Sequence, residues 1–130
     1  MVVKIKFYYE DFRDCMDVMY GTFGINCFDL FNAINQENPL IMIGIAMDTP
    51  PEYDPTFIET KNVDEKNKYL IDIAKKLFDY ITHNEEKIED GEENEAEIDI
   101  DPNIAERIET IEVYNVSEYD YALLFVFNLR

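Results

Sequence analysis

The sequence predicts an α+β fold, in which a mixed or antiparallel sheet of about five strands is packed by about three helices. Short apolar runs that alternate or are continuous are typical of strands, and one longer stretch has apolar residues at helical spacing. A length of 130 residues and a hydrophobic content of 47% suit a single globular domain spanning residues 1–130. The predicted order of elements is β-α-α-β-α-β-β-β.

Two strands are predicted in the first third of the chain. Val2–Tyr9 alternates between apolar and polar residues, which indicates a half-buried strand. Lys4 and Lys6 fall on one face of it, as expected of a sheet edge guarded by lysine. Leu40–Met47 is continuously apolar and predicts a strand covered on both faces, with Gly44 marking a bulge or a close helix contact.

Three helices are predicted from apolar residues at helical spacing. The first covers Glu10–Tyr20, and the second begins with Asn26 as its N-cap and ends before Pro39. The third and clearest covers Asn62–His83. Asn62 and Glu65 resemble a capping box at its start.

The remaining strands are predicted in the second half of the chain. Residues 48–62 contain three prolines and read as a surface loop with a short extended piece at Phe57–Glu59. Glu97–Asp101 alternates acidic residues with isoleucine, which predicts a strand with an acidic outer face. Arg107–Val116 and Tyr121–Leu129 predict a hairpin joined through residues 117–120.

The acidic segment, residues 84–101, dominates the charge of the protein. It carries half of the net charge of −18, with Lys87 as its only cation. A charge that large repels itself and exceeds what solubility requires. The carboxylates are therefore predicted to bind a partner, and they are Glu85, Glu86, Glu89, Asp90, Glu92, Glu93, Glu95, Glu97, Asp99 and Asp101.

The conformation of the acidic segment sets its charge density. If residues 84–90 continue the preceding helix, Gly91 is its natural stop. As a helix the whole segment would span about 27 Å and carry about one charge per 3 Å, close to the ~3.4 Å phosphate spacing along one DNA strand. As an extended chain it would span about 60 Å, at half that density.

Calcium binding is the first alternative use of so many carboxylates. Asp99, Asp101 and Asn103 imitate the opening of an EF-hand loop. However, Ile104 stands where that loop needs glycine, and Thr110 stands where it needs glutamate. We therefore predict no metal site and no cofactor.

Enzymatic chemistry is not indicated either. The chain has no glycine-rich phosphate loop or nucleophile motif, and His83, the only histidine, is expected on the surface at a helix end. Cys15 and Cys27 have neither zinc nor redox spacing and are expected to be buried and reduced. With no signal peptide or membrane span in the pattern, a cytoplasmic protein is expected, in the host cell if a phage encodes it.

The predicted function is that of a non-enzymatic acidic inhibitor of a basic nuclease or nucleic-acid-binding protein. In size and charge the chain is similar to phage anti-CRISPR and anti-restriction proteins, without any shared motif. Direct binding to nucleic acid or to anionic lipid is disfavoured, because both are polyanions.

Three alternatives stay open. The first is an immunity protein that neutralises a basic nuclease toxin. The second is a structural or assembly module, possibly a homodimer, whose acidic residues serve only solvation. A carboxylate-dependent metal enzyme ranks lowest.

Overall fold

The fold is α+β, as predicted, and is built on one six-stranded mixed sheet. A computed structural model describes residues 1–12, 28, 31–33, 37–47, 57–116 and 121–130. The strands are β1 (Val2–Asp11), β2 (Ile41–Met47), β3 (Phe57–Lys61), β4 (Glu92–Asp99), β5 (Ile108–Asn115) and β6 (Tyr121–Leu129). The helices are η1 (Glu65–Asn67), α2 (Tyr69–His83), η2 (Glu85–Lys87) and α3 (Pro102–Ala105).

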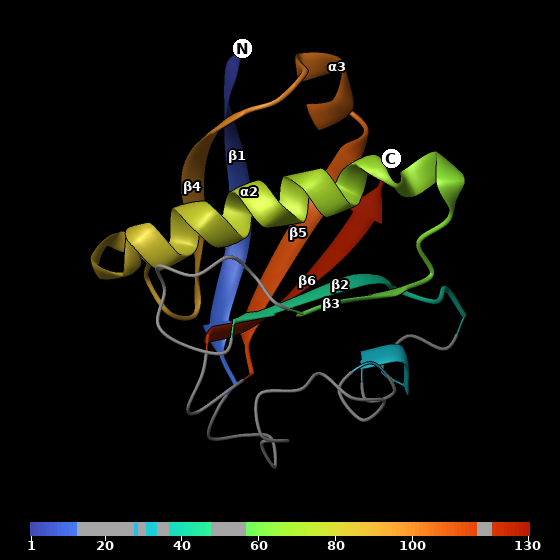
Figure 1. Ribbon diagram of the computed structural model, residues 1–130, viewed down its shortest axis with the longest axis horizontal. Helices are drawn as coiled ribbons and strands as arrows, with labels where there is room; N and C mark the ends of the chain where they lie inside the picture. The colour runs from blue at the N-terminus through green and yellow to red at the C-terminus, as the bar shows by residue number, and fades with distance from the viewer. Residues whose placement is uncertain (13–27, 29–30, 34–36, 48–56, 117–120) are drawn as a thin grey trace.

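The strands lie in the order β3-β2-β6-β5-β1-β4 (Figure 1). Only β1 and β5 are parallel, and every other neighbouring pair is antiparallel. The C-terminal ends of β1, β2 and β5 therefore meet the N-terminal ends of β3, β4 and β6 at one end of the sheet. The sixth strand is β3, which the sequence indicated only as a short extended piece.

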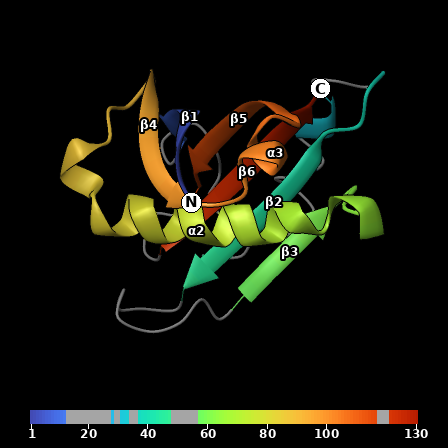
Figure 2. The ribbon, with the colours of Figure 1, turned by 90° about the horizontal axis from the view of Figure 1, so that it is seen from above.

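One face of the sheet is covered by α2 (Figures 1 and 2). The helix is amphipathic, so one side of it is apolar and packs on the inward residues of the strands. Those strand residues include Ile5 and Phe7 of β1 and Phe125 of β6, each of them buried. The buried residues of α2 are Leu70, Ile73, Ala74, Leu77, Phe78 and Ile81.

The opposite face carries a smaller apolar cluster over β2, β6 and part of β5. Phe12 and Phe31 stack with ring centroids 5.9 Å apart, and each lies 4.7 Å from the ring of Tyr114. Phe28, which is helical like residues 31–33, belongs to the same cluster. Aromatic packing thus closes this side of the sheet, while the part formed by β1 and β4 stays polar.

The start of the long helix differs from the prediction. Asn62 is not its cap: it adopts a left-handed φ of 62° and donates its side-chain amide to the Leu40 carbonyl at 2.6 Å. The cap is Asp64, whose carboxylate accepts from the backbone N–H groups of Lys66 and Asn67 at 2.9 and 3.1 Å. A single turn of 3-10 helix, η1, precedes α2.

Three further predictions need correction. Lys4 and Lys6 do not guard an edge, because β1 lies between β5 and β4. The helix predicted from Glu10 does not begin there, since β1 continues to Asp11. Of the two alternatives for Gly44, the bulge is wrong, as β2 pairs without interruption on both sides of it.

Pro102 opens the helix α3, which the sequence did not predict. Several predictions lie outside the described residues: the rest of the first helix, both cysteines, the proline-rich loop at 48–56 and the turn at 117–120. Among the described helices, none is both long and apolar enough to cross a bilayer.

Candidate protein-binding surface

Strand β4 displays most of the second half of the acidic segment on one face. It pairs antiparallel with β1, and its inward positions Asn94, Ala96 and Ile98 are buried, the last two in the same core cluster as the apolar side of α2. The positions between them are exposed and point to the other side of the sheet, away from α2. We call these four residues the acidic row: Glu93, Glu95, Glu97 and Asp99.

The turn before β4 is organised by Asn94, the only buried polar residue among those described. Its side-chain oxygen accepts from the Glu89 N–H at 2.9 Å. Its amide donates to the carbonyls of Glu89 and Glu92 at 3.1 and 3.0 Å. One side chain therefore satisfies three backbone groups and fixes the path of residues 89–92.

This turn is also tied to the end of β1. The Asp90 carboxylate accepts from the Asp11 N–H at 2.7 Å, and the Gly91 N–H donates to the Tyr9 carbonyl at 2.8 Å. Gly91 has a φ of 77°, a left-handed conformation that glycine adopts without strain. Gly91 thus serves a strand-opening turn and does not stop a helix, because α2 already ends at His83.

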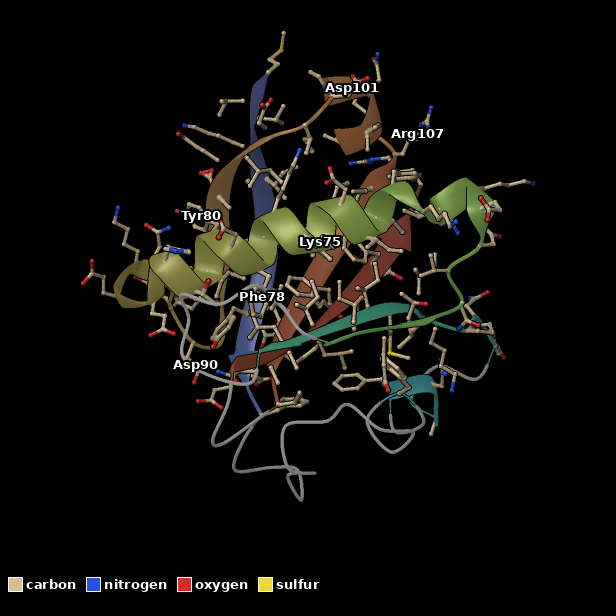
Figure 3. The ribbon with its side chains drawn as sticks, in the orientation of Figure 1. Lys75, Phe78, Tyr80, Asp90, Asp101 and Arg107 are labelled. Carbon is tan, nitrogen blue, oxygen red and sulfur yellow. The ribbon has the colours of Figure 1, made fainter. Side chains whose placement is uncertain are left out.

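All ten predicted binding carboxylates are exposed and follow one edge of the sheet. Figure 3 shows Asp90 and Asp101 at opposite ends of that edge. Two carboxylates lie on η2, three lie in or beside the turn, four form the acidic row, and the last caps α3. In that order they are Glu85 and Glu86, then Glu89, Asp90 and Glu92, then Glu93, Glu95, Glu97 and Asp99, then Asp101.

The acidic row is partly neutralised by cations. Lys4 stands directly opposite Glu97, and Lys6 opposite Glu95, in the β1–β4 register. The Lys6 ammonium also lies 3.9 Å from the Glu93 carboxylate. At the far end of the row, the N-terminal amine of Met1 lies 2.6 Å from Asp99 and lowers the pKa of that carboxyl.

Among the described residues, negative charge is instead concentrated at one end of the sheet, where the turn meets the ends of β1 and β5. Tyr8 of β1 lies beside Glu93 in the β1–β4 register and beside Glu112 in the β1–β5 register. We call this group of seven carboxylates the acidic end: Glu10, Asp11, Glu89, Asp90, Glu92, Glu93 and Glu112.

The electrostatics of the acidic end appear in the pKa values of its neighbours. Partial burial raises the pKa of the Tyr8 hydroxyl, and the charges of Glu10, Asp90 and Glu112 raise it further. The pKa of Glu92 is raised by a hydrogen bond with Glu89 and by the charge of that neighbour. Glu89 and Glu92 therefore act directly on each other, and the charges of Glu10, Asp90 and Glu112 all reach the Tyr8 hydroxyl.

The observed charge spacing is wider than that of a nucleic-acid strand. Alternate residues of a strand are about 6.7 Å apart, so the acidic row has about half of the linear charge density of one DNA strand. Residues 84–90 do not continue α2, which ends at His83 and is followed only by the 3-10 turn η2, so the segment does not have the charge density of a continuous helix. Close packing of charges is found instead at the acidic end, where three strands and a turn meet.

Three members of the acidic end, Glu10, Asp11 and Glu112, were not among the predicted binding residues. They come from β1 and β5, which lie outside the acidic segment in the chain, so only the strand order reveals them. The sequence did contain one signal, the matched alternation of lysines in residues 2–9 and acids in residues 93–99.

The other chemically interesting residues have structural roles. Asp101 accepts from the Asn103 N–H at 2.9 Å and caps α3. His83 is exposed in the last turn of α2, as predicted, with its ring nitrogen 2.7 Å from the Asp79 carbonyl. Within the described parts of the chain, no three histidine, cysteine or acidic side chains are grouped so that they could hold a metal ion.

Comparison with protein-family models, with curated proteins and with solved structures found no match for this chain. The surface must therefore be interpreted from its own geometry.

Proposed function

We propose that this protein is a non-enzymatic inhibitor that binds a basic nuclease or nucleic-acid-binding protein by presenting carboxylates in place of phosphates. The observation that carries the proposal is the acidic end. There, the turn at residues 89–92 is held by Asn94 and tied to β1, so the backbone that carries its carboxylates, and the Asp90 carboxylate itself, are held in place before any partner arrives. Preorganisation lowers the entropic cost of binding.

The charge arrangement favours a cationic partner over no partner. Like charges gathered at one end of a sheet lower the stability of the fold, and a basic groove would relieve that repulsion. Seven carboxylates in one place also create a field that steers a cationic protein toward them and speeds association at low salt.

The described surface offers little support for the assembly-module alternative. Its large exposed apolar side chains are Met1, Val2 and Ile58, of which the first two lie at the start of β1 and the third on β3. Apolar residues this scattered do not form the core that stable homodimer interfaces require.

The test is capture followed by competitive release. The immobilised protein is incubated with bacterial lysate at low salt and then washed with a short DNA duplex. We expect the duplex to release basic nucleic-acid-binding proteins, because they would use the same groove for DNA and for this protein. Capture of no such protein, or captured proteins that DNA cannot displace, would contradict the proposal.

Two charge-matched variants sharpen the test. One replaces five predicted carboxylates with amides: Glu85, Glu86, Glu89, Glu92 and Glu93. The other does the same to five exposed acids elsewhere: Glu37, Glu65, Asp72, Glu106 and Glu109. Each variant makes the net charge of −18 less negative by five. Only the first variant should fail to capture basic nucleic-acid-binding proteins.

If the captured protein is a nuclease encoded beside this gene, the role is immunity against a toxin. If the gene lies among phage genes, the role is counter-defence. The binding chemistry is the same in both cases.

A further inference from the structure

The outer edge of β4 has no strand beside it in the described fold. β4 is the last strand of the sheet and pairs only with β1. In an edge strand, alternate residues direct their N–H and C=O groups outward, where they can pair with an added strand. The eight residues of β4 therefore offer a template about 26 Å long, except that the Asp99 carbonyl at its end already accepts from the Lys76 ammonium.

Helix α2 extends beyond this edge. Figures 1 and 2 both show the C-terminal end of α2, with η2, lying outside β4. A cavity of about 400 Å³ lies beneath the overhang. Tyr80 and Asn84 are on the α2 side of the sheet, whereas Glu95 and Glu97 point to the other side, so the cavity runs around the free edge. Its lining consists of Lys4, Tyr80, Asn84, Lys87, Glu95 and Glu97.

The charges on β1 and β4 indicate what kind of added strand would fit beside β4. Lys4 and Lys6 of β1 already stand opposite Glu97 and Glu95 on the paired side of β4. A lysine or arginine at alternate positions of an added strand would stand opposite the same carboxylates from the free side. Opposite charges across neighbouring strands stabilise pairing, and like charges oppose it. A second copy of β4 would place carboxylate against carboxylate.

We infer that the free edge of β4 binds an extended segment of the basic partner, with lysine or arginine at alternate positions, as an additional strand. The cations would lie over the acidic row, and the residues between them would lie under the overhang, against Tyr80 and Asn84. This inference rests on the proposed function, because it takes a basic protein as the partner, and it adds how that protein is held.

The probe is a blocked seven-residue peptide with lysine at its second, fourth and sixth positions and threonine elsewhere. Two further peptides carry backbone N-methyl groups, one at the lysines and the other at the threonines. The charge is the same in all three. Strand pairing uses the N–H groups of only one alternate set, so one methylated peptide should bind at least about tenfold more weakly than the other.

Titration calorimetry gives the affinities, and amide hydrogen exchange followed by NMR locates the contact. We expect slowed exchange at alternate amides of residues 93–99. In the protein, the double charge reversal Glu95→Lys with Glu97→Lys should abolish binding of the lysine peptide and allow binding of the corresponding glutamate peptide.

Three results would overturn the inference. Equal binding of all three peptides would mean attraction by charge alone. No binding at low salt would mean that the edge takes no basic strand. Concentration-dependent protection of the β4 amides in the free protein would mean that a second copy covers the edge. The proposed function would survive each of these results if DNA-displaceable capture still depended on the acidic end.

Discussion

The side chain of Asn94 should control both the stability of the protein and the shape of the acidic end. It makes three hydrogen bonds to backbone groups and is only 9% exposed. At about 1 kcal/mol net for each bond, Asn94→Ala would cost up to about 3 kcal/mol. Water can replace part of that hydrogen bonding in a surface turn, so we expect a loss of about 2 kcal/mol.

Urea unfolding measures this loss as a lower midpoint with an unchanged slope. The matched control is Asn103→Ala, which alters an exposed asparagine on α3 and should change the free energy of unfolding by less than about 0.5 kcal/mol. Amide exchange should also become faster at Glu89 and Gly91 while β6 stays protected. If Asn94→Ala changed stability no more than the control, Asn94 would not organise the turn.

An isosteric substitution of Asn94 separates the effect of side-chain shape from the effect of charge. Asn94→Asp keeps an acceptor for the Glu89 N–H, but it removes both donors and places a carboxylate against the Glu89 and Glu92 carbonyls. Burial and neighbouring acids should raise the pKa of the new carboxyl above its value in the unfolded chain. Its contribution to stability is then most favourable below the unfolded pKa and is lost as pH rises through the folded pKa. This variant should therefore unfold more easily at pH 7 than at pH 4, relative to the parent protein measured at the same two pH values.

Three other outcomes follow from single contacts. Gly91→Ala should lower the free energy of unfolding in urea by about 1–2 kcal/mol through backbone strain alone, because a Cβ there meets no atom within 4 Å. Gly91→Asn should lower it by less, and equal losses for the two variants would argue against a left-handed turn. Phe125→Ala should cost about 3–5 kcal/mol, since the ring is fully buried beneath α2, and a loss below 1 kcal/mol would contradict that packing. Acetylating the Met1 amine should raise the pKa of Asp99 in an NMR titration, because the amine now lowers it. The stability from this pair is present above the unfolded pKa of Asp99 and fades as pH falls through the folded value, so an unchanged titration would exclude the contact.

The sequence alone was sufficient to predict the elements whose buried residues form a simple pattern. β2 and β6 lie inside the sheet and are continuously apolar, and α2 shows an apolar stripe over 15 residues. β4 begins at Glu92, five residues before the predicted start at Glu97. The early part was missed because its inward residues, Asn94 and Ala96, are not strongly apolar. Burial there depends on a hydrogen-bond network and on a small side chain.

The candidate binding surface could be predicted only in part. The carboxylates of residues 84–101 are visible in the chain, and all of them are exposed. Their neutralisation by Lys4 and Lys6 depends on pairing between strands about ninety residues apart, which no local pattern specifies. The addition of Glu10 and Glu112 to the acidic end likewise follows from the position of β1 between β4 and β5.

The most direct test of the central claim compares the two charge-matched variants in their association with a captured basic partner. Stopped-flow or surface-based kinetics over a range of salt concentrations gives the association rate of each. Loss of the five carboxylates on η2 and around the turn should reduce both the association rate at low salt and its salt dependence, while loss of five acids elsewhere should leave both near those of the parent protein. Equal effects of the two variants would show that only total charge matters, and the claim that a preorganised acidic end is the binding surface would be wrong.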